Sequence, residues 1–142
     1  MRSFEETRII HCSAANMFTV VMDIEAYPEF LPWVTGASIL TRSNGDLTAE
    51  LVADFAGSHH TFRTIDRFVV NKLVEIRLLD GPFRFLESIW TFDQLDDVSC
   101  KVHFSIEFEF RNMMLDLVAS PIFATACKSM VQAFEKRARG VS

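Results

Sequence analysis

The sequence predicts an α+β fold, in which a curved antiparallel sheet wraps around a long C-terminal helix. Two periodic patterns favour this fold. Apolar and polar side chains alternate from residue 34 to residue 111, as in β-strands, and apolar residues then recur at helical spacing from residue 112 to about residue 137. The third observation is length, because 142 residues are enough for a single domain, spanning residues 1–142, with its own core.

Residues 1–33 predict one strand followed by two short helical segments. Residues 3–11 alternate loosely between apolar and polar side chains, as a strand does. Ser13 can cap a helix over residues 14–23, where apolar side chains recur at helical spacing. Pro28 and Pro32 exclude one long helix through the next segment, so we expect a short helix or a turn there.

Five strands are expected between residues 36 and 94, separated by turn residues. Asn44-Gly45 is typical of a hairpin turn, because both residues adopt positive φ at little cost. Further turns are expected at residues 56–58, near Asn71 and at residues 80–82. The strands themselves are expected at residues 36–42, 47–55, 59–68, 73–79 and 84–94.

The last strand, at residues 99–110, carries the clearest alternation in the chain. Its apolar side chains all point one way, and polar or charged residues occupy the positions between them. One face of this strand is therefore packed or lines a cavity, while the other face meets water. The apolar positions are Val102, Phe104, Ile106, Phe108 and Phe110.

A long helix is expected after Asn112, whose side chain can cap the first turn. Pro121 lies inside this helix and should kink it or begin its second segment. Cationic residues follow at its C-terminal end, where the helix dipole favours them. The stripe expected to face the sheet consists of Met114, Leu117, Val118, Ile122, Ala126, Met130, Ala133 and Phe134.

The composition is acidic and rich in phenylalanine. Fourteen Lys and Arg against 19 Asp and Glu give a net charge of −5, which disfavours direct binding to nucleic acid. The chain has 14 Phe but one Tyr and two Trp, and Phe is the aromatic residue without a polar group. This balance fits either a Phe-rich core or an apolar cavity lined with rings. Cys12, Cys100 and Cys127 show no disulfide spacing, so reduced thiols are expected.

Targeting signals are not apparent in the sequence. No run approaches 18 consecutive apolar residues, so we expect no membrane-spanning helix. The opening segment MRSFEETRII has neither the apolar stretch of a signal peptide nor the acid-poor character of a transit peptide. We therefore expect a cytoplasmic protein, with peripheral contact at the inner face of the membrane.

Four segments carry a family resemblance, namely YPEFLPW at 27–33, GPFRFLESIWTF at 81–92, VHFSIEFEF at 102–110 and AFEKRA at 133–138. They resemble the coenzyme Q-binding members of the START-like, or helix-grip, family within the polyketide cyclase/START superfamily. The resemblance covers most of the chain and implies the helix-grip fold. It also implies binding of ubiquinone in support of respiration, without catalysis and without another required cofactor. Some bacterial relatives are described as toxins that block association of the ribosomal subunits, and mitochondrial relatives carry a presequence that this chain lacks, so a bacterial member is expected.

A carrier of such a ligand needs an apolar cavity, because each CH₂ of a prenyl tail costs about 0.8 kcal/mol to move from bilayer to water. We expect a cavity of about 300 Å³ or more between the sheet and the helix. The residues expected to contact the ligand are Trp33, Phe62, Phe83, Phe104, Phe108, Phe110, Val118, Ile122, Ala126 and Met130.

Rings near two loops form a candidate membrane-facing lip at the mouth of that cavity. Tyr27, Phe30 and Trp33 lie in the proline-rich segment, and Phe83 lies in the loop before the strand at 84–94. Aromatic side chains suit a lipid–water interface. The alternative interpretation is that these rings are buried and hold a corner of the core together.

Two other functions stay open at the level of sequence. A START-like cyclase or hydrolase would need an acid or base in the cavity, for which His60 and Asp54 are candidates. A ribosome-binding protein would need a basic patch, for which the candidates are Lys128, Lys136, Arg137 and Arg139. No metal site is expected at His59-His60, because neighbours in a strand point to opposite faces.

Overall fold

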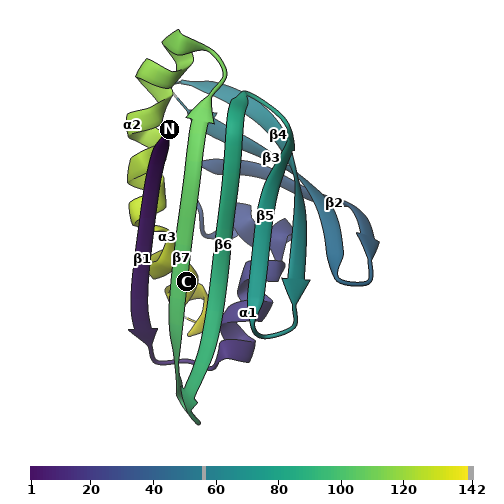
Figure 1. The fold of residues 1–142 in the computed structure, drawn as a ribbon, viewed down its shortest axis with the longest axis vertical. Coiled ribbons are helices and arrows are strands. Elements are labelled where there is room, and N and C mark those ends of the chain that lie inside the picture. The colour runs from purple at the N-terminus through teal and green to yellow at the C-terminus, as the bar shows by residue number, and fades with distance from the viewer. Residues whose placement is uncertain (56, 141–142) are drawn as a thin grey trace.

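The computed structural model describes residues 1–55 and 57–140. In this part of the chain seven strands form one antiparallel sheet in the order β1-β7-β6-β5-β4-β3-β2. The sheet curves around the helices, which lie on its concave side (Figure 1). The elements are β1 (Arg2–Ile10), α1 (Ala14–Met22), the 3-10 helix η1 (Ile24–Glu29), β2 (Val34–Ser43), β3 (Asp46–Phe55), β4 (Ser58–Val69), β5 (Leu73–Asp80), β6 (Phe83–Asp96), β7 (Ser99–Phe110), α2 (Met113–Lys128) and α3 (Met130–Ala138).

The predicted fold class, a curved antiparallel sheet with a C-terminal helix, is confirmed. Hairpins join β2 through β7 in chain order, whereas β1 returns to pair with β7. Gly45 closes the β2–β3 hairpin with φ of +85°, and Asn71 closes the β4–β5 hairpin with φ of +63°. The turn predicted at residues 56–58 includes Ala56, which lies outside the described residues.

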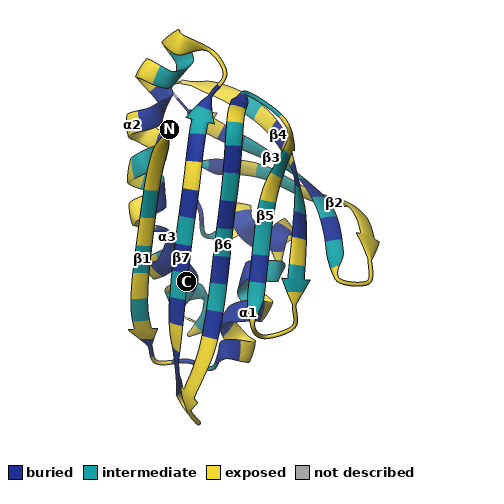
Figure 2. Ribbon diagram, in the orientation of Figure 1, coloured by how far each residue is buried: buried dark blue, intermediate teal, exposed yellow. Residues whose placement is uncertain are grey.

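Strand β7 forms the clearest wall of the core. All five apolar positions predicted to share a face are buried, whereas Lys101 and Glu107 on the opposite face are exposed. Figure 2 shows this alternation along β6 and β7. The alternating pattern therefore identified the concave, inner face of this strand correctly.

The two predicted helix caps are also confirmed. Ser13 Oγ accepts a hydrogen bond from the Asn16 amide at 3.1 Å. Asn112 Oδ1 accepts hydrogen bonds from the amides of Met114 and Leu115 at 2.8 and 3.1 Å. Each cap satisfies amide groups that have no partner inside the helix.

The C-terminal helix differs from the prediction at its interruption. Helix α2 continues through Pro121, and the break falls at Ser129, between α2 and α3. Pro121 is exposed, so the carbonyl group that loses its intrahelical donor can be hydrated. At the break, the Ser129 hydroxyl donates to the Ala126 carbonyl oxygen at 3.0 Å and so competes with helix continuation.

The buried face of α2 is rotated from the predicted stripe. Its buried residues are Ala119, Ser120, Phe123 and Cys127, three of them small. Small side chains allow the helix to approach the sheet closely, so the larger aliphatic residues point outward. By length and composition alone, Met113–Ala138 is apolar enough to cross a membrane, although core helices of soluble proteins meet the same criterion and a third of its most apolar window is buried here.

Candidate functional site

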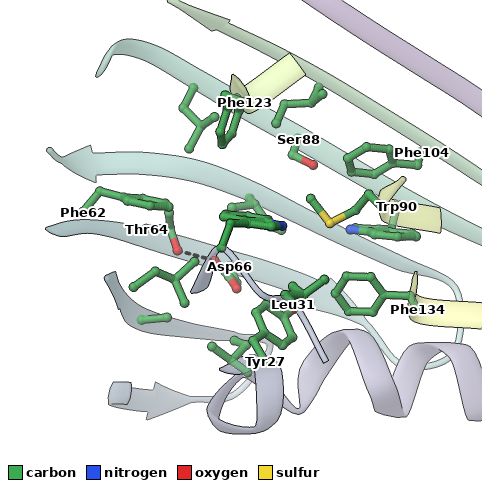
Figure 3. Close-up of a pocket in the computed structure, with 18 residues that line it drawn as sticks. Tyr27, Leu31, Phe62, Thr64, Asp66, Ser88, Trp90, Phe104, Phe123 and Phe134 are labelled. Atoms are coloured by element: carbon green, nitrogen blue, oxygen red, sulfur yellow. Dashed lines mark hydrogen bonds between the residues drawn. The ribbon is translucent and has the colours of Figure 1, made fainter. Parts of the chain in front are cut away.

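An apolar cavity of about 80 Å³ lies between the concave face of the sheet and the helices. Five strands, η1 and both C-terminal helices contribute to its wall (Figure 3). Most of the lining is hydrocarbon, and the polar exceptions are few. The lining residues are Ile24, Tyr27, Leu31, Trp33, Ala49, Leu51, Phe62, Thr64, Asp66, Ile76, Leu86, Ser88, Trp90, Phe104, Ile106, Phe123, Met130 and Phe134.

This cavity is much smaller than the 300 Å³ expected from the sequence, so the prediction of a large preformed cavity is wrong. An engineered cavity of about 150 Å³ is known to hold benzene, which makes the present space too small for a substituted ring. The reason is the packing of Phe123, whose ring centroid lies 4.7 Å from Phe108 and 5.2 Å from Phe55. Part of the phenylalanine excess therefore fills the core.

Four of the ten predicted ligand contacts line the cavity, namely Trp33, Phe62, Phe104 and Met130. They come from the loop after η1, from β4, from β7 and from α3. Phe104 packs against Trp90 with ring centroids 4.5 Å apart. Contact with a ligand at these positions stays a prediction.

Three more of the predicted residues lie behind the wall. Phe83, Phe108 and Phe110 are buried but form a ring cluster with Phe123 next to the cavity. The rings of Phe83 and Phe110 are stacked, with centroids 4.5 Å apart. The prediction that these rings line the cavity is wrong, because neighbouring rings cover them.

The three predicted residues on α2 also lie outside the cavity. Val118 and Ile122 are 49% and 43% exposed, and Ala126 is half-buried. None of the three contributes to the lining. The prediction is wrong here because the buried face of α2 is turned by about one residue from the stripe, as Ala119 and Phe123 demonstrate.

Asp66 on β4 is the polar residue that distinguishes this cavity. It is 4% exposed, and its Oδ1 accepts a hydrogen bond from the Thr64 hydroxyl at 2.8 Å (Figure 3). Burial raises the pKa of the Asp66 carboxyl from 3.8 to about 6, although the Thr64 hydrogen bond opposes this change. No Lys, Arg or His lies among the described lining residues, so the charge has no cation beside it.

Ser88 on β6 lies in the same lateral row of the sheet as Asp66. Asp66 pairs with Ile76 on β5, and Ile76 pairs with Ser88. All three side chains line the cavity. With strands about 4.8 Å apart, the two polar residues lie about 10 Å from each other across the cavity wall.

Asp66 was not among the residues predicted for the cavity, although the sequence carries a signal for it. Arg63 and Arg67 have the same parity in the strand at 59–68, and both are exposed. Thr64 and Asp66 alternate with these arginines, so they share the opposite face with Phe62. An acidic residue on a face that carries a buried ring is a candidate for a functional group.

The histidines predicted as candidates lie away from the cavity. His59 pairs with Asp54 at 3.1 Å, and both side chains are largely exposed. His60 stacks on Phe55 with ring centroids 5.9 Å apart, outside the lining. His60 and Asp54 are therefore wrong as candidates for an acid or base in the cavity. Over residues 1–55 and 57–140, no cluster of three or more potential metal ligands occurs.

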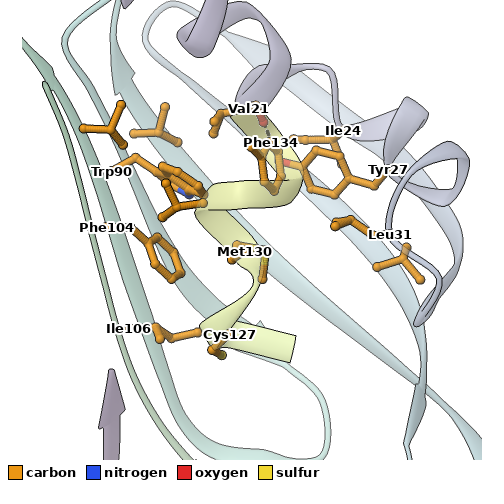
Figure 4. Packing of buried hydrophobic residues seen from close by; sticks show 14 of the residues in the cluster. Val21, Ile24, Tyr27, Leu31, Trp90, Phe104, Ile106, Cys127, Met130 and Phe134 are labelled. Atoms are coloured by element: carbon orange, nitrogen blue, oxygen red, sulfur yellow. Dashed lines mark hydrogen bonds between the residues drawn. The ribbon is translucent and has the colours of Figure 1, made fainter. Parts of the chain in front are cut away.

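The predicted membrane-facing lip is largely buried. Tyr27 is 8% exposed and Phe83 is fully buried, so the interpretation as a lip is wrong for them. Figure 4 shows Phe134 between Tyr27 of η1 and Trp90 of the sheet, with centroid distances of 5.3 and 5.1 Å. The Tyr27 hydroxyl donates to the Val21 carbonyl oxygen, and burial raises the pKa of this phenol. These rings hold a corner of the core together.

Comparison with known proteins identifies relatives along nearly the whole chain. A family model described as "Polyketide cyclase / dehydrase and lipid transport" matches residues 10–135. The chain is 36% identical over 141 residues to the ribosome association toxin RatA of Escherichia coli, covering 99% of this chain and 89% of that protein. It is 30% identical to a mitochondrial coenzyme Q-binding protein, COQ10 homolog B of Xenopus laevis, covering 95% of this chain and 57% of that protein.

A solved structure shares the fold. The Zhui aromatase/cyclase from Streptomyces sp. R1128 matches with a TM-score of 0.86, covering 97% of this chain and 93% of that chain. At 17% sequence identity, this likeness shows the fold alone. The expected helix-grip architecture is thereby confirmed.

Proposed function

Because the chain belongs to the polyketide cyclase/dehydrase and lipid transport family, we propose that it binds a prenylated quinone, such as ubiquinone, between its sheet and its C-terminal helices. The observation that carries this proposal is an apolar, ring-lined cavity with a few polar groups in its wall, among them Asp66 and Ser88. A quinone combines an apolar tail and ring with two oxygen atoms, which fits such a lining. The relationship to a coenzyme Q-binding protein supports the same ligand class.

Binding requires the cavity to widen, because about 80 Å³ cannot hold the ring. Helix α2 is the element proposed to move. It contributes Phe123 to the wall, its outer face is exposed, and the helix break at Ser129 separates it from α3. In its proposed role as a carrier supporting respiration, the protein would load and unload its ligand at the membrane, where the outer face of α2 makes transient contact.

Two tryptophans in the lining provide a direct assay. Trp33 and Trp90 are the only tryptophans in the chain, and both face the cavity. Titration with a short-tail ubiquinone analogue is expected to quench their fluorescence in a saturable manner. Ala49→Leu adds three carbon atoms to the lining and is expected to weaken binding at least about tenfold, because the added volume occupies the ligand site.

The matched control for that variant is Ala126→Leu, which adds the same volume outside the cavity and should bind as the parent protein does. Equal affinity for Ala49→Leu and the parent would contradict a site in this cavity. Mass spectrometry of an organic extract, from protein purified out of its own host, would identify the natural ligand. Recovery of an unchanged quinone agrees with non-catalytic binding, whereas a chemically converted product would point to a cyclase-type enzyme.

A second candidate function is association with the ribosome, favoured by the 36% identity to RatA. The C-terminal helices carry exposed cations at Lys128, Lys136 and Arg139. The fourth predicted member of the basic patch, Arg137, pairs with Glu29 at 2.8 Å and lies over the Phe30 ring. These three exposed cations, on α2, on α3 and just after α3, could contact the phosphates of rRNA despite the net charge of −5.

Co-sedimentation with purified ribosomal subunits tests this candidate. Lys128→Glu combined with Lys136→Glu is expected to abolish co-sedimentation at low salt. Arg42→Glu combined with Arg67→Glu makes the same charge change on exposed strand positions and should have no effect. Co-sedimentation that survives the first pair of substitutions would show that the basic patch does not bind the ribosome.

A further inference from the structure

Asp66 and Ser88 together suggest which redox form of a quinone the cavity accepts. Among the described residues that line the cavity, Asp66 supplies the carboxylate. This carboxylate accepts a hydrogen bond from one side chain, the Thr64 hydroxyl. A carboxylate has about four acceptor positions, so it can take further hydrogen bonds from a ligand. Ser88 is 8% exposed and lines the same cavity, where its hydroxyl is a second polar group.

The two redox forms of a quinone differ in what they offer these groups. The oxidised ring has two carbonyl oxygens, which only accept hydrogen bonds, whereas the reduced quinol has two hydroxyl groups that donate as well. When a carboxylate faces a carbonyl oxygen, both groups are acceptors and no proton is available to form a hydrogen bond between them. The free-energy cost of removing water from the carboxylate is then not offset. A quinol hydroxyl facing Asp66 forms a charge-assisted hydrogen bond, which is among the stronger kinds.

We infer that the cavity selects the quinol over the oxidised quinone, with the Asp66 carboxylate accepting a hydrogen bond from one ring hydroxyl and Ser88 contacting the oxygen at the opposite end of the ring. The row Asp66–Ile76–Ser88 places a polar group on either side of an apolar centre. A para-quinol has the same order of polar, apolar and polar groups. A serine hydroxyl can donate or accept, so Ser88 serves either redox form and Asp66 sets the preference.

The selection depends on pH through the charge of Asp66. Around it, β3 contributes Ala49 and Leu51, β5 to β7 contribute apolar residues with Ser88, and α2 and α3 contribute Phe123, Met130 and Phe134. The titratable group that faces Asp66 from another element is Tyr27 of η1, whose pKa is raised and which stays neutral. Below a pKa of about 6 the protonated Asp66 can itself donate to a quinone carbonyl, so the preference for quinol should fall.

This inference rests on the proposed function, and calorimetry separates the two. A one-isoprene ubiquinone analogue and its chemically reduced quinol are titrated anaerobically into the full chain at pH 7.5 and at pH 5. The quinol is expected to bind roughly tenfold more tightly at pH 7.5, and the ratio should fall to within about twofold at pH 5. Binding of both forms with equal affinity at pH 7.5 overturns the inference and leaves quinone binding intact. Binding of neither form overturns the inference together with the proposed function.

Asp66→Asn tests the role of the carboxylate itself. The amide keeps the shape and can accept from Thr64, but it carries no charge and its NH₂ group donates to a carbonyl oxygen. The variant is expected to lose the quinol preference at pH 7.5 and to lose the pH dependence. Asp54→Asn, at an exposed position on β3, makes the same chemical change outside the cavity and should retain both. A preference that persists in Asp66→Asn would exclude Asp66 as its source.

Discussion

A buried carboxyl group without a cation is unfavourable for folding, and Asp66 is such a group. The folded chain holds its pKa at about 6, compared with 3.8 for an unperturbed side chain. The folded state therefore binds the proton more tightly than the unfolded chain does. The stabilisation that protonated Asp66 gives the folded state, relative to the ionised form, is complete below about pH 3.8 and is lost as the pH rises through about 6. The difference corresponds to about 3 kcal/mol at neutral pH.

Asp66→Asn is therefore expected to stabilise the protein at pH 7.5, by about 1–3 kcal/mol, because the amide avoids desolvating a charge. Urea denaturation at several pH values measures this effect. The gain should shrink as the pH falls through 6 and should disappear below about pH 4, where the parent Asp66 is protonated in both states. A gain that is independent of pH would mean that charge is not its cause. A loss of stability at neutral pH is a cost that functional sites often carry.

At the scale of residues, the sequence predicted which apolar side chains face inward better than which polar ones do. Phe104 of β7 and Phe62 of β4 were both expected in the cavity and both line it. Asp66 was missed because composition rules place carboxylates at the surface, and its strand alternates less cleanly. The cavity volume was overestimated because a sequence lists rings but does not reveal how closely Phe123 packs among them.

At the scale of elements, the strands and turns were predictable and the orientation of α2 was not. Each predicted strand exists, with its ends within two residues of the prediction, because alternation and turn residues are local signals. The facing stripe of α2 depends on how closely the helix approaches the sheet, which is a tertiary property. Ala119 and Ser120 face inward for that reason, leaving Met114 and Leu117 outside, 75% and 73% exposed.

The exposed apolar face of α2, formed by Met113, Met114, Leu117, Val118 and Ile122, is expected to touch lipid. Leu117→Asp should reduce flotation with zwitterionic liposomes severalfold, because a charge at the interface must stay hydrated. Thermal stability should change little, since Leu117 is exposed. Flotation should depend little on salt, because zwitterionic lipid carries no net charge and the expected contact is apolar.

The matched control for this variant is Val98→Asp, at a position that is 69% exposed in the β6–β7 turn, far along the sheet from α2. It introduces the same charge and should leave flotation unchanged. Equal flotation of Leu117→Asp and the parent protein would show that α2 is not the lipid contact.

The whole molecule combines a continuous sheet with a loosely held helix. Strand β7 is paired along its length with β1 on one side and β6 on the other. Helix α2 is attached at its first turn, where the Asp116 carboxylate pairs with Arg2 of β1 at 3.1 Å and accepts a hydrogen bond from the Phe110 amide of β7 at 3.3 Å. Beyond that turn, one face of α2 packs on the sheet while the opposite face is exposed. Widening of the cavity is therefore expected to come from α2 rather than from the strands.

Hydrogen exchange measured by mass spectrometry can test this division. Peptides covering residues 113–128 are expected to exchange at least about tenfold faster than peptides covering residues 99–110, because opening of α2 breaks fewer buried contacts than separation of β7 from both neighbours. A saturating short-tail quinol should slow exchange in α2, since the ligand fills the space beneath Phe123 and gives the displaced helix a surface to pack against. Exchange in β7 should not change. If α2 exchanges as slowly as β7 in the free protein, the helix is not the gate, and the ring would have to enter past Leu31 and Trp33 instead.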